Sequence, residues 1–336
     1  MKKVRLSLFF FVFLMAFRGS ICFAQTALEL AELNGPVKRY ENIDYSVDQD
    51  EKGRVTVEIY EKTIMEFDRE GHVLSFEVYD EDGELEDHYE TAISTNEGGG
   101  RQIEYFFEDN EGKRFRGATL VYDRRGNIVE ELVYNEDGSL DTKAVRKTDE
   151  SGNVIEETTC NIEEGDSETT RYRYDEMGNE IEWIGDDGDR GVTEYDDRGN
   201  RTTYSYYNVQ GEREFQSLYR YDERRNMVEE ITYARPDGSY SDRYVYRYDD
   251  AGRRIESRMY RHGEEDAWHI GQYSYDQKGR KIKDAFYRAD GSLRLINTYV
   301  YDEWGNILES KSYYQSEDAE KPSLSDFETT KYDYWE

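Results

Sequence analysis

A Tyr-Asp-x-x-Gly motif recurs along this chain at a nearly constant interval. Full copies begin at Tyr122, Tyr174, Tyr195, Tyr248, Tyr275 and Tyr301. When degenerate copies are included, such as the one at Phe67 and the one at Tyr221, eleven units fit between residues 49 and 313. Seven of the ten successive steps are 26 or 27 residues long. A period of this length indicates a repeat protein, in which each unit is one supersecondary element that packs against its neighbours.

Each unit carries two turn signals. In the motif, the Asp side chain can accept a backbone N–H two residues on, and the Gly is expected in the left-handed conformation that closes a bulged hairpin. The residues assigned to this structural turn motif are Tyr122, Asp123, Gly126, Tyr174, Asp175, Gly178, Tyr195, Asp196, Gly199, Tyr248, Asp249, Gly252, Tyr275, Asp276, Gly279, Tyr301, Asp302 and Gly305. Arg225 takes the place of the Gly in one copy, where a Cβ is disfavoured. The second turn follows about 16 residues later, as at Asp137-Gly138 and Asp187-Gly188.

The segments between the turns have the alternation of β-strands. In residues 243–248, three Tyr share one face and two Arg share the other. Outgoing segments such as 128–134 place apolar residues on both faces, which a bulge or partial cover of the second face would explain. Two turns per unit predict an all-β protein of about 22 short strands from about 11 tandem hairpins. We expect one long antiparallel sheet, coiled by its own twist or open and solenoid-like.

The two ends of the chain differ from the repeats. Residues 1–24 have a basic start, an apolar run and small residues before Gln25, which predicts a signal peptide. An uncleaved anchor and a lipoprotein attached through Cys22 are weaker alternatives. Residues 25–48 are interpreted as an N-terminal cap with a short helix at 28–33 and a first strand. The repeats occupy 49–313, and 314–336 form a C-terminal loop and closing strand.

Charge and composition limit the partners. The net charge is −32, which argues against nucleic acid binding and against attraction to anionic lipid. A membrane-spanning β-barrel is rejected because the strand faces carry Tyr, Arg and Glu, where hydrocarbon requires an aliphatic band. No membrane span is expected in the mature chain.

After removal of the signal, Cys160 is a lone thiol that cannot form an internal disulfide. We therefore predict an exported, acidic protein of the periplasm, the outer surface or the secreted fraction.

The motif resembles the YD-repeat, or RHS-repeat, proteins of bacterial surfaces and secretion systems. The residues that carry the resemblance are the Tyr-Asp-x-x-Gly-Asn and Gly-Arg turns, each followed by an aromatic-ended strand and an Asp-Gly turn, over about residues 49–313. In larger members, such repeats form a spiralling β-shell around a toxin domain. This chain has eleven units and ends at Glu336 without a downstream toxin. The resemblance therefore implies an open or short coiled sheet here and identifies no activity.

The sequence contains no recognised catalytic motif. His72, His88, His262 and His269 fall in different units, and the many acidic residues single out no glycosidase pair. We predict no catalytic residue, metal or cofactor. Specific calcium binding at residues 80–83 is the weaker alternative to diffuse cation binding by the acidic surface. Aromatic residues that can stack on a ligand are Trp304, at a turn tip, and the strand residues Trp268 and Trp183.

These observations favour a non-enzymatic function. The leading hypothesis is an exported repeat scaffold or binding protein that presents an acidic, Tyr-rich sheet to an unidentified protein or glycan of the cell envelope. The alternative is a carbohydrate-binding or adhesive module that uses exposed aromatic residues. A glycosidase-like enzyme is the least favoured hypothesis.

Overall fold

The secondary structure of this protein consists of β-strands throughout the part that the computed structural model describes, namely residues 33–49, 54–108, 112–234, 239–316, 319 and 321–336. The predicted signal peptide, Cys22 and almost all of the predicted short helix at 28–33 lie outside these residues. The strands are β1 Val37–Gln49, β2 Val55–Phe67, β3 Val73–Tyr79, β4 Leu85–Thr95, β5 Arg101–Glu108, β6 Arg114–Tyr122, β7 Ile128–Tyr134, β8 Leu140–Thr148, β9 Val154–Asn161, β10 Asp166–Tyr174, β11 Glu180–Ile184, β12 Arg190–Tyr195, β13 Arg201–Tyr207, β14 Arg213–Tyr221, β15 Met227–Tyr233, β16 Asp242–Tyr248, β17 Arg254–Arg261, β18 His269–Tyr275, β19 Lys281–Arg288, β20 Leu293–Tyr301, β21 Ile307–Tyr314 and β22 Ser323–Tyr334.

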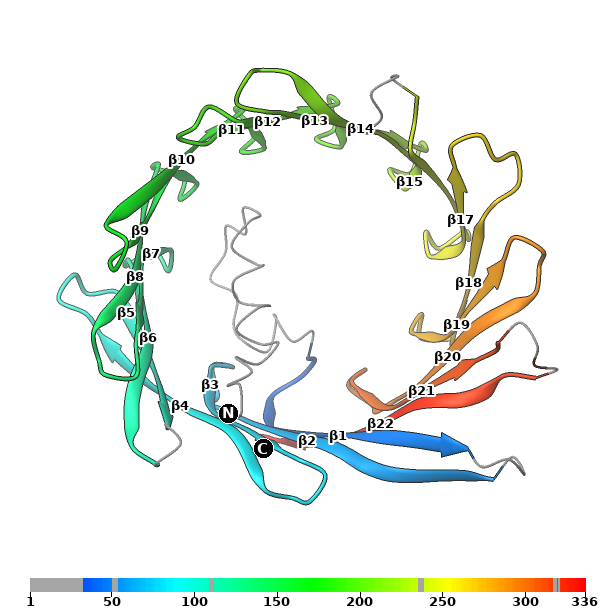
Figure 1. Ribbon diagram of the computed structural model, residues 1–336, viewed down its shortest axis with the longest axis horizontal. Helices are drawn as coiled ribbons and strands as arrows, with labels where there is room; N and C mark the ends of the chain where they lie inside the picture. The colour runs from blue at the N-terminus through cyan, green and yellow to red at the C-terminus, as the bar shows by residue number, and fades with distance from the viewer. Residues whose placement is uncertain (1–32, 50–53, 109–111, 235–238, 317–318, 320) are drawn as a thin grey trace.

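The sheet is closed into a 22-stranded barrel (Figure 1). Each strand pairs antiparallel with the next, and β22 pairs with β1 from Tyr45↔Phe327 to Val37↔Tyr334. The prediction of all-β structure is confirmed, but the prediction of an open or solenoid-like sheet is wrong. The reason is that the first and last strands are complementary edges. Their pairing satisfies N–H and C=O groups that an open sheet would leave exposed.

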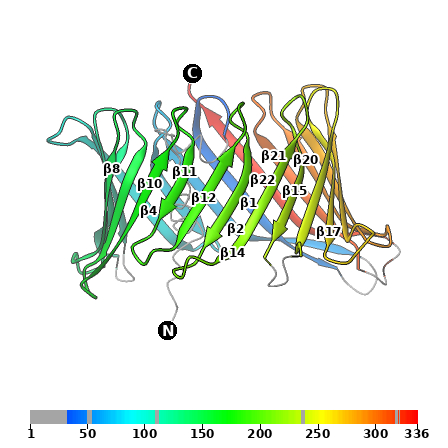
Figure 2. The ribbon, with the colours of Figure 1, turned by 90° about the horizontal axis from the view of Figure 1, so that it is seen from above.

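The two kinds of turn lie at opposite rims of the barrel, because every connection joins neighbouring antiparallel strands. We call the end with the Tyr-Asp turns the motif rim and the other end the Asp-Gly rim. The strands run between the rims at a tilt (Figure 2). Seen down the barrel, the turns of the motif rim lie on the inner side of the ring, and the turns of the Asp-Gly rim flare outward (Figure 1).

The motif turns share one geometry, which the turn after β10 illustrates. Asp175 Oδ1 accepts the backbone N–H groups of Met177 and Asn179, each at 2.9 Å. Asn179 Nδ2 donates to the other carboxylate oxygen at 2.9 Å, and Gly178 has a φ of 83°. Arg225 adopts the same left-handed conformation with a φ of 69°, although it has a Cβ.

A β-bulge recurs at the motif turns and changes which face of the sheet the first side chains of the outgoing strand point to. The pairing register of β6 and β7 shifts between Val121 and Tyr122, so that Tyr122 pairs with Ile128. Ile128 then packs against the buried cluster of Ile103, Leu120 and Tyr122. The bulge accounts for the neighbouring apolar residues Ile128 and Val129, whereas Leu132 and Val133 lie on opposite faces in regular register with Thr119 and Ala118.

The inner face of the barrel is the aromatic face. The described chain begins inside the ring (Figure 1), and Leu33 packs there against a cluster that contains Met65, Phe76 and Tyr89. The cross-strand register carries this face around the ring, so that Trp183 and Tyr246 also lie on it. Phe67 and Val37, two of the most buried described side chains, belong to this cluster.

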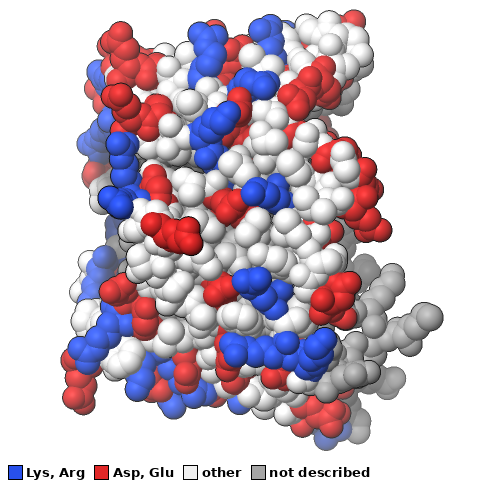
Figure 3. Space-filling model, turned by 90° about the vertical axis from the view of Figure 1, so that its left-hand side faces the viewer, with Lys and Arg blue, Asp and Glu red and all other residues white. Residues whose placement is uncertain are grey.

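The outer face carries ion pairs in a regular pattern. Glu229, on β15, lies between Arg220 and Arg243 at 2.7 and 2.6 Å. Other acidic residues are flanked by two cations in the same way: Glu156 by Lys147 and Arg171, Glu182 by Arg173 and Arg190, and Glu256 by Arg247 and Arg258. Positive and negative side chains are interspersed over the wall that Figure 3 shows.

Candidate functional site: the inner aromatic face

Six of the motif tyrosines anchor their unit to the previous one. Tyr248 Oη donates to the backbone oxygen of Met227 at 2.7 Å, which spans from β16 to the start of β15. The same bond joins Tyr174 to Val154, Tyr195 to Glu180, Tyr221 to Arg201, Tyr275 to Arg254 and Tyr301 to Lys281, at 2.6–2.9 Å. Burial is the main cause that raises the pKa of the Tyr248 hydroxyl. These tyrosines hold the barrel wall together.

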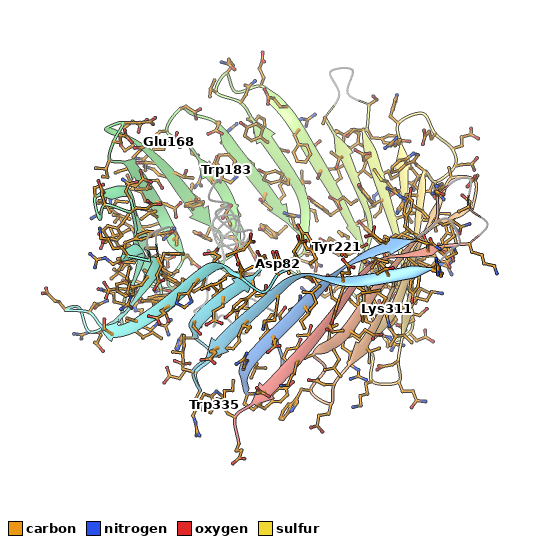
Figure 4. All side chains as sticks on the ribbon, turned by 60° about the horizontal axis from the view of Figure 1, so that its bottom comes forward. Asp82, Glu168, Trp183, Tyr221, Lys311 and Trp335 are labelled. Atoms are coloured by element: carbon orange, nitrogen blue, oxygen red, sulfur yellow. The ribbon has the colours of Figure 1, made fainter. Side chains whose placement is uncertain are left out.

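Stacked rings cover the inner face between the rims. Trp183, on β11, and Tyr206, on β13, have ring centroids 6.0 Å apart and planes at 30°. Gly191 lies between them in the sheet, and a Cβ there would be 2.1 Å from Trp183 Nε1. Only glycine therefore allows the indole to lie against the β12 backbone. The result is an aromatic platform at the Asp-Gly rim, and Figure 4 labels Trp183 on the wall across the barrel from β1 and β2.

The three tryptophans proposed as ligand-binding residues lie at separate places. Trp304 is in the motif turn after β20 and packs against Gly35 and Tyr334 at the seam between β22 and β1. Trp268 precedes β18, and the guanidinium carbon of Arg261 lies 3.5 Å from its ring centroid. Trp183 is on the inner face. The structure therefore brings no two of them together, and it places only Trp183 on the platform.

A polar trio occurs in the degenerate motif turn after β2. His72 stands where most motif turns have Asn, and its Nδ1 lies 2.9 Å from Asp68 Oδ2 and 3.8 Å from Glu70 Oε2. The hydrogen bond from His72 lowers the pKa of Asp68, against the opposing effect of burial. Arg101 contacts the other imidazole nitrogen through Nη1. A metal ion on this trio would thus share the imidazole with a guanidinium, so the arrangement fits a turn brace better than a metal site.

The register also creates a row of carboxyl groups that the sequence analysis did not identify. Asp44, on β1, is directly opposite Glu61 on β2 and Glu328 on β22. Burial, followed by repulsion from Asp44, raises the pKa of Glu61 and of Glu328, and burial raises the pKa of Asp44 itself. The three residues lie far apart in the sequence, and only the closure of the barrel brings Glu328 to Asp44.

Comparison with known proteins gives structural likenesses only. No family model and no curated protein matches the chain. A chain from the crystal structure of TcdB2-TccC3-Cdc42 is 14% identical, with a TM-score of 0.33, over 84% of this chain and 19% of that chain. A porin-like protein from Bacteroides uniformis is 8% identical, with a TM-score of 0.31, over 89% of this chain and 99% of that chain. A porin-like protein from Bacteroides vulgatus is 14% identical, with a TM-score of 0.24.

The present chain therefore spans about a fifth of the length of the toxin-complex chain. The likeness to YD-repeat proteins remains a resemblance of sequence motifs, because no family model matches the chain. In the described part of the chain, no helix has the length and apolar character needed to cross a membrane.

Proposed function

We propose that this protein is an exported, non-enzymatic barrel scaffold that holds a protein partner of the cell envelope at its inner aromatic face. The observation that carries the proposal is the division of the wall into two faces. Aromatic rings are concentrated on the inside, where the buried Arg146 also pairs with Glu131 and Glu157, whereas the outside carries rows of ion pairs, as around Glu229. Trp and Tyr are enriched among the few residues that dominate the binding energy of protein interfaces.

The arrangement of polar residues supports binding over turnover. His72, His88 and His269 lie on a motif turn, on β4 and on β18, and the carboxylates of the motif turns are used as acceptors for backbone N–H groups. Nucleophilic and acid–base catalysis need a nucleophile or substrate proton within hydrogen-bond reach of a base. The separation of these groups around a wide ring favours a contact function. Export rests on the predicted signal peptide.

Photocrosslinking from neighbouring positions tests this function. Tyr246 faces the inside and Arg247, the next residue, pairs with Glu256 on the outside. A photoreactive amino acid at position 246 in the full chain is expected to capture a partner in the native envelope, and the same group at position 247 is the matched control. Capture at 247 but not at 246, or capture at neither position, would overturn the proposal.

A further inference from the structure

The aromatic platform at the Asp-Gly rim lacks the cation that several other inner rings have, such as Tyr246 and Tyr219. Arg254 lies over Tyr246 and Tyr273, with its guanidinium carbon 5.2 and 5.1 Å from the two ring centroids. Arg201 lies in the same way over Tyr219, at 4.4 Å. Among the described residues, no Lys or Arg lies over Trp183 or Tyr206. This part of the inner face therefore presents open aromatic rings to the lumen.

Carboxylates without a cationic partner adjoin the same rings. The turn after β11 contains Asp187 and Asp189, and Tyr206 Oη donates to Asp189 Oδ2 at 3.2 Å. Within the described chain, neither Asp187 nor Asp189 forms an ion pair, in contrast to Asp186 of the same turn, which lies 3.5 Å from Arg171. Burial, and then the contact with Asp187, raises the pKa of Asp189. Two neighbouring carboxylates of like charge gain stability when a cation comes between them.

The surrounding rim has the same charge. Four consecutive turns of the Asp-Gly rim, those between β7 and β14, contain acidic residues and no Lys or Arg: residues 135–139, 162–165, 185–189 and 208–212. An acidic mouth attracts basic segments and raises their rate of association. A positively charged ligand is favoured by three features: the acidic rim, the two carboxylates that have no cationic partner, and the two rings that have no cation over them.

We propose that Trp183, Tyr206, Asp187 and Asp189 form a binding site for an arginine or lysine side chain of a basic polypeptide segment that enters the barrel at the Asp-Gly rim. The cation stacks on the platform and its N–H groups reach the two carboxylates, which combines a cation–π contact with charge-assisted hydrogen bonds. This inference rests on the proposed function and specifies the chemistry of the partner segment. A neutral glycan would use the rings but would not need either carboxylate charge.

Binding of a synthetic peptide with four arginines spaced by Gly-Ser tests the site. We expect it to quench Trp fluorescence of the full mature chain, with an affinity that falls as salt is added. Trp183→Leu and the double change D187N/D189N are each expected to weaken binding at least about tenfold, the range expected for losing a desolvated cation–aromatic or charge contact. The matched controls are Trp268→Leu, whose ring is already covered by Arg261, and Asp290→Asn, which is in an equivalent Asp-Gly turn. Both controls are expected to bind within about twofold of wild type, because they lie outside the site.

Three outcomes would overturn the inference. The first is an unchanged peptide affinity in D187N/D189N. The second is no binding of the arginine peptide at all. The third is salt-independent binding of a polysaccharide at Trp183 instead of binding of the peptide. If the peptide fails while position 246 still captures an envelope protein, the inference about the cation is wrong and the scaffold function stands. If position 246 captures nothing, the scaffold function itself is wrong.

Discussion

Asn306 and Asn34 are 272 residues apart in the sequence and form two hydrogen bonds across the seam that closes the barrel. The backbone N–H of Asn34 donates to Asn306 Oδ1 at 2.6 Å, and Asn306 Nδ2 donates to the backbone oxygen of Asn34 at 2.8 Å. Asn306 is only 2% exposed. The motif turn that contains it also places Trp304 over Gly35. The last full copy of the repeat motif therefore holds the first strand in place.

Replacing Asn306 with Ala is expected to weaken this seam. The change removes the two partly buried hydrogen bonds to the backbone of Asn34, and each bond contributes about 0.5–1.5 kcal/mol. We expect a lower urea midpoint and faster hydrogen exchange in β1 and β22.

Asn179→Ala is the matched control, because Asn179 occupies the same motif position and, within the described residues, its side chain donates only to Asp175 in its own turn. It should affect its own hairpin and leave exchange in β1 and β22 as in wild type. Equal exchange of these two strands in N306A and N179A would contradict a special role for the Asn306–Asn34 contact.

Replacing Tyr248 with Phe tests the tyrosine anchor. The change removes the 2.7 Å hydrogen bond to Met227 but keeps the ring, so we expect the free energy of unfolding to fall by about 1 kcal/mol. Tyr287, an outer-face residue of β19, has no hydrogen bond to its hydroxyl among the described residues, and Tyr287→Phe is the control. If chemical denaturation gives the same loss for both variants, the anchor contributes nothing specific.

The local part of this fold could be predicted from the sequence because turn chemistry depends on a few adjacent residues. Asp175 and Gly178 specify a bulged hairpin through their own backbone preferences, and the alternation in 243–248 separates a Tyr face from an Arg face. These features gave the all-β class and the number of strands.

Closure could not be predicted, because it depends on the sum of small strand twists and on pairs that no local pattern encodes. Asp44 faces Glu328 only after 22 strands have completed the ring. For the same reason, the sequence indicated Trp183 as a candidate but did not indicate Tyr206 or Asp189 beside it. The glycine at position 191 was the one available signal, since glycine inside a strand often marks a close approach of a large side chain.

Replacing Gly178 with Ala isolates the cost of the left-handed turn. Gly178 has a φ of 83°, and nothing lies within 4 Å of the position that a Cβ would occupy. The expected loss of about 1–2 kcal/mol therefore reflects backbone strain and not a clash. Asn tolerates this conformation better, so Gly178→Asn is expected to be destabilised less than Gly178→Ala when thermal melting is measured. A G178A variant as stable as wild type would show that the turn relaxes into another conformation.

The carboxyl row at the seam predicts an unusual pH dependence. The pKa values of Asp44, Glu61 and Glu328 are raised in the folded barrel, with burial as the largest cause. Protons therefore bind the folded state more readily than the unfolded chain. The contribution of these groups to the free energy of unfolding rises as pH falls through the folded pKa values and is complete below the unfolded values of about 4.

Asp44→Asn removes one charge from this row and keeps an oxygen that can accept the hydrogen bond from Asn42, which is 3.0 Å long in the wild-type barrel. We expect the variant to be more stable than wild type at neutral pH, and the difference to shrink as pH falls through the raised pKa range. Asp175→Asn is the opposite control, because hydrogen bonds to the turn lower the pKa of Asp175. That variant should be less stable at neutral pH and converge with wild type only at more acidic pH. Urea unfolding from about pH 4 to about pH 7 compares the two slopes, and a D44N variant that is less stable than wild type at neutral pH would show that the charged Asp44 carboxylate does not destabilise the folded barrel.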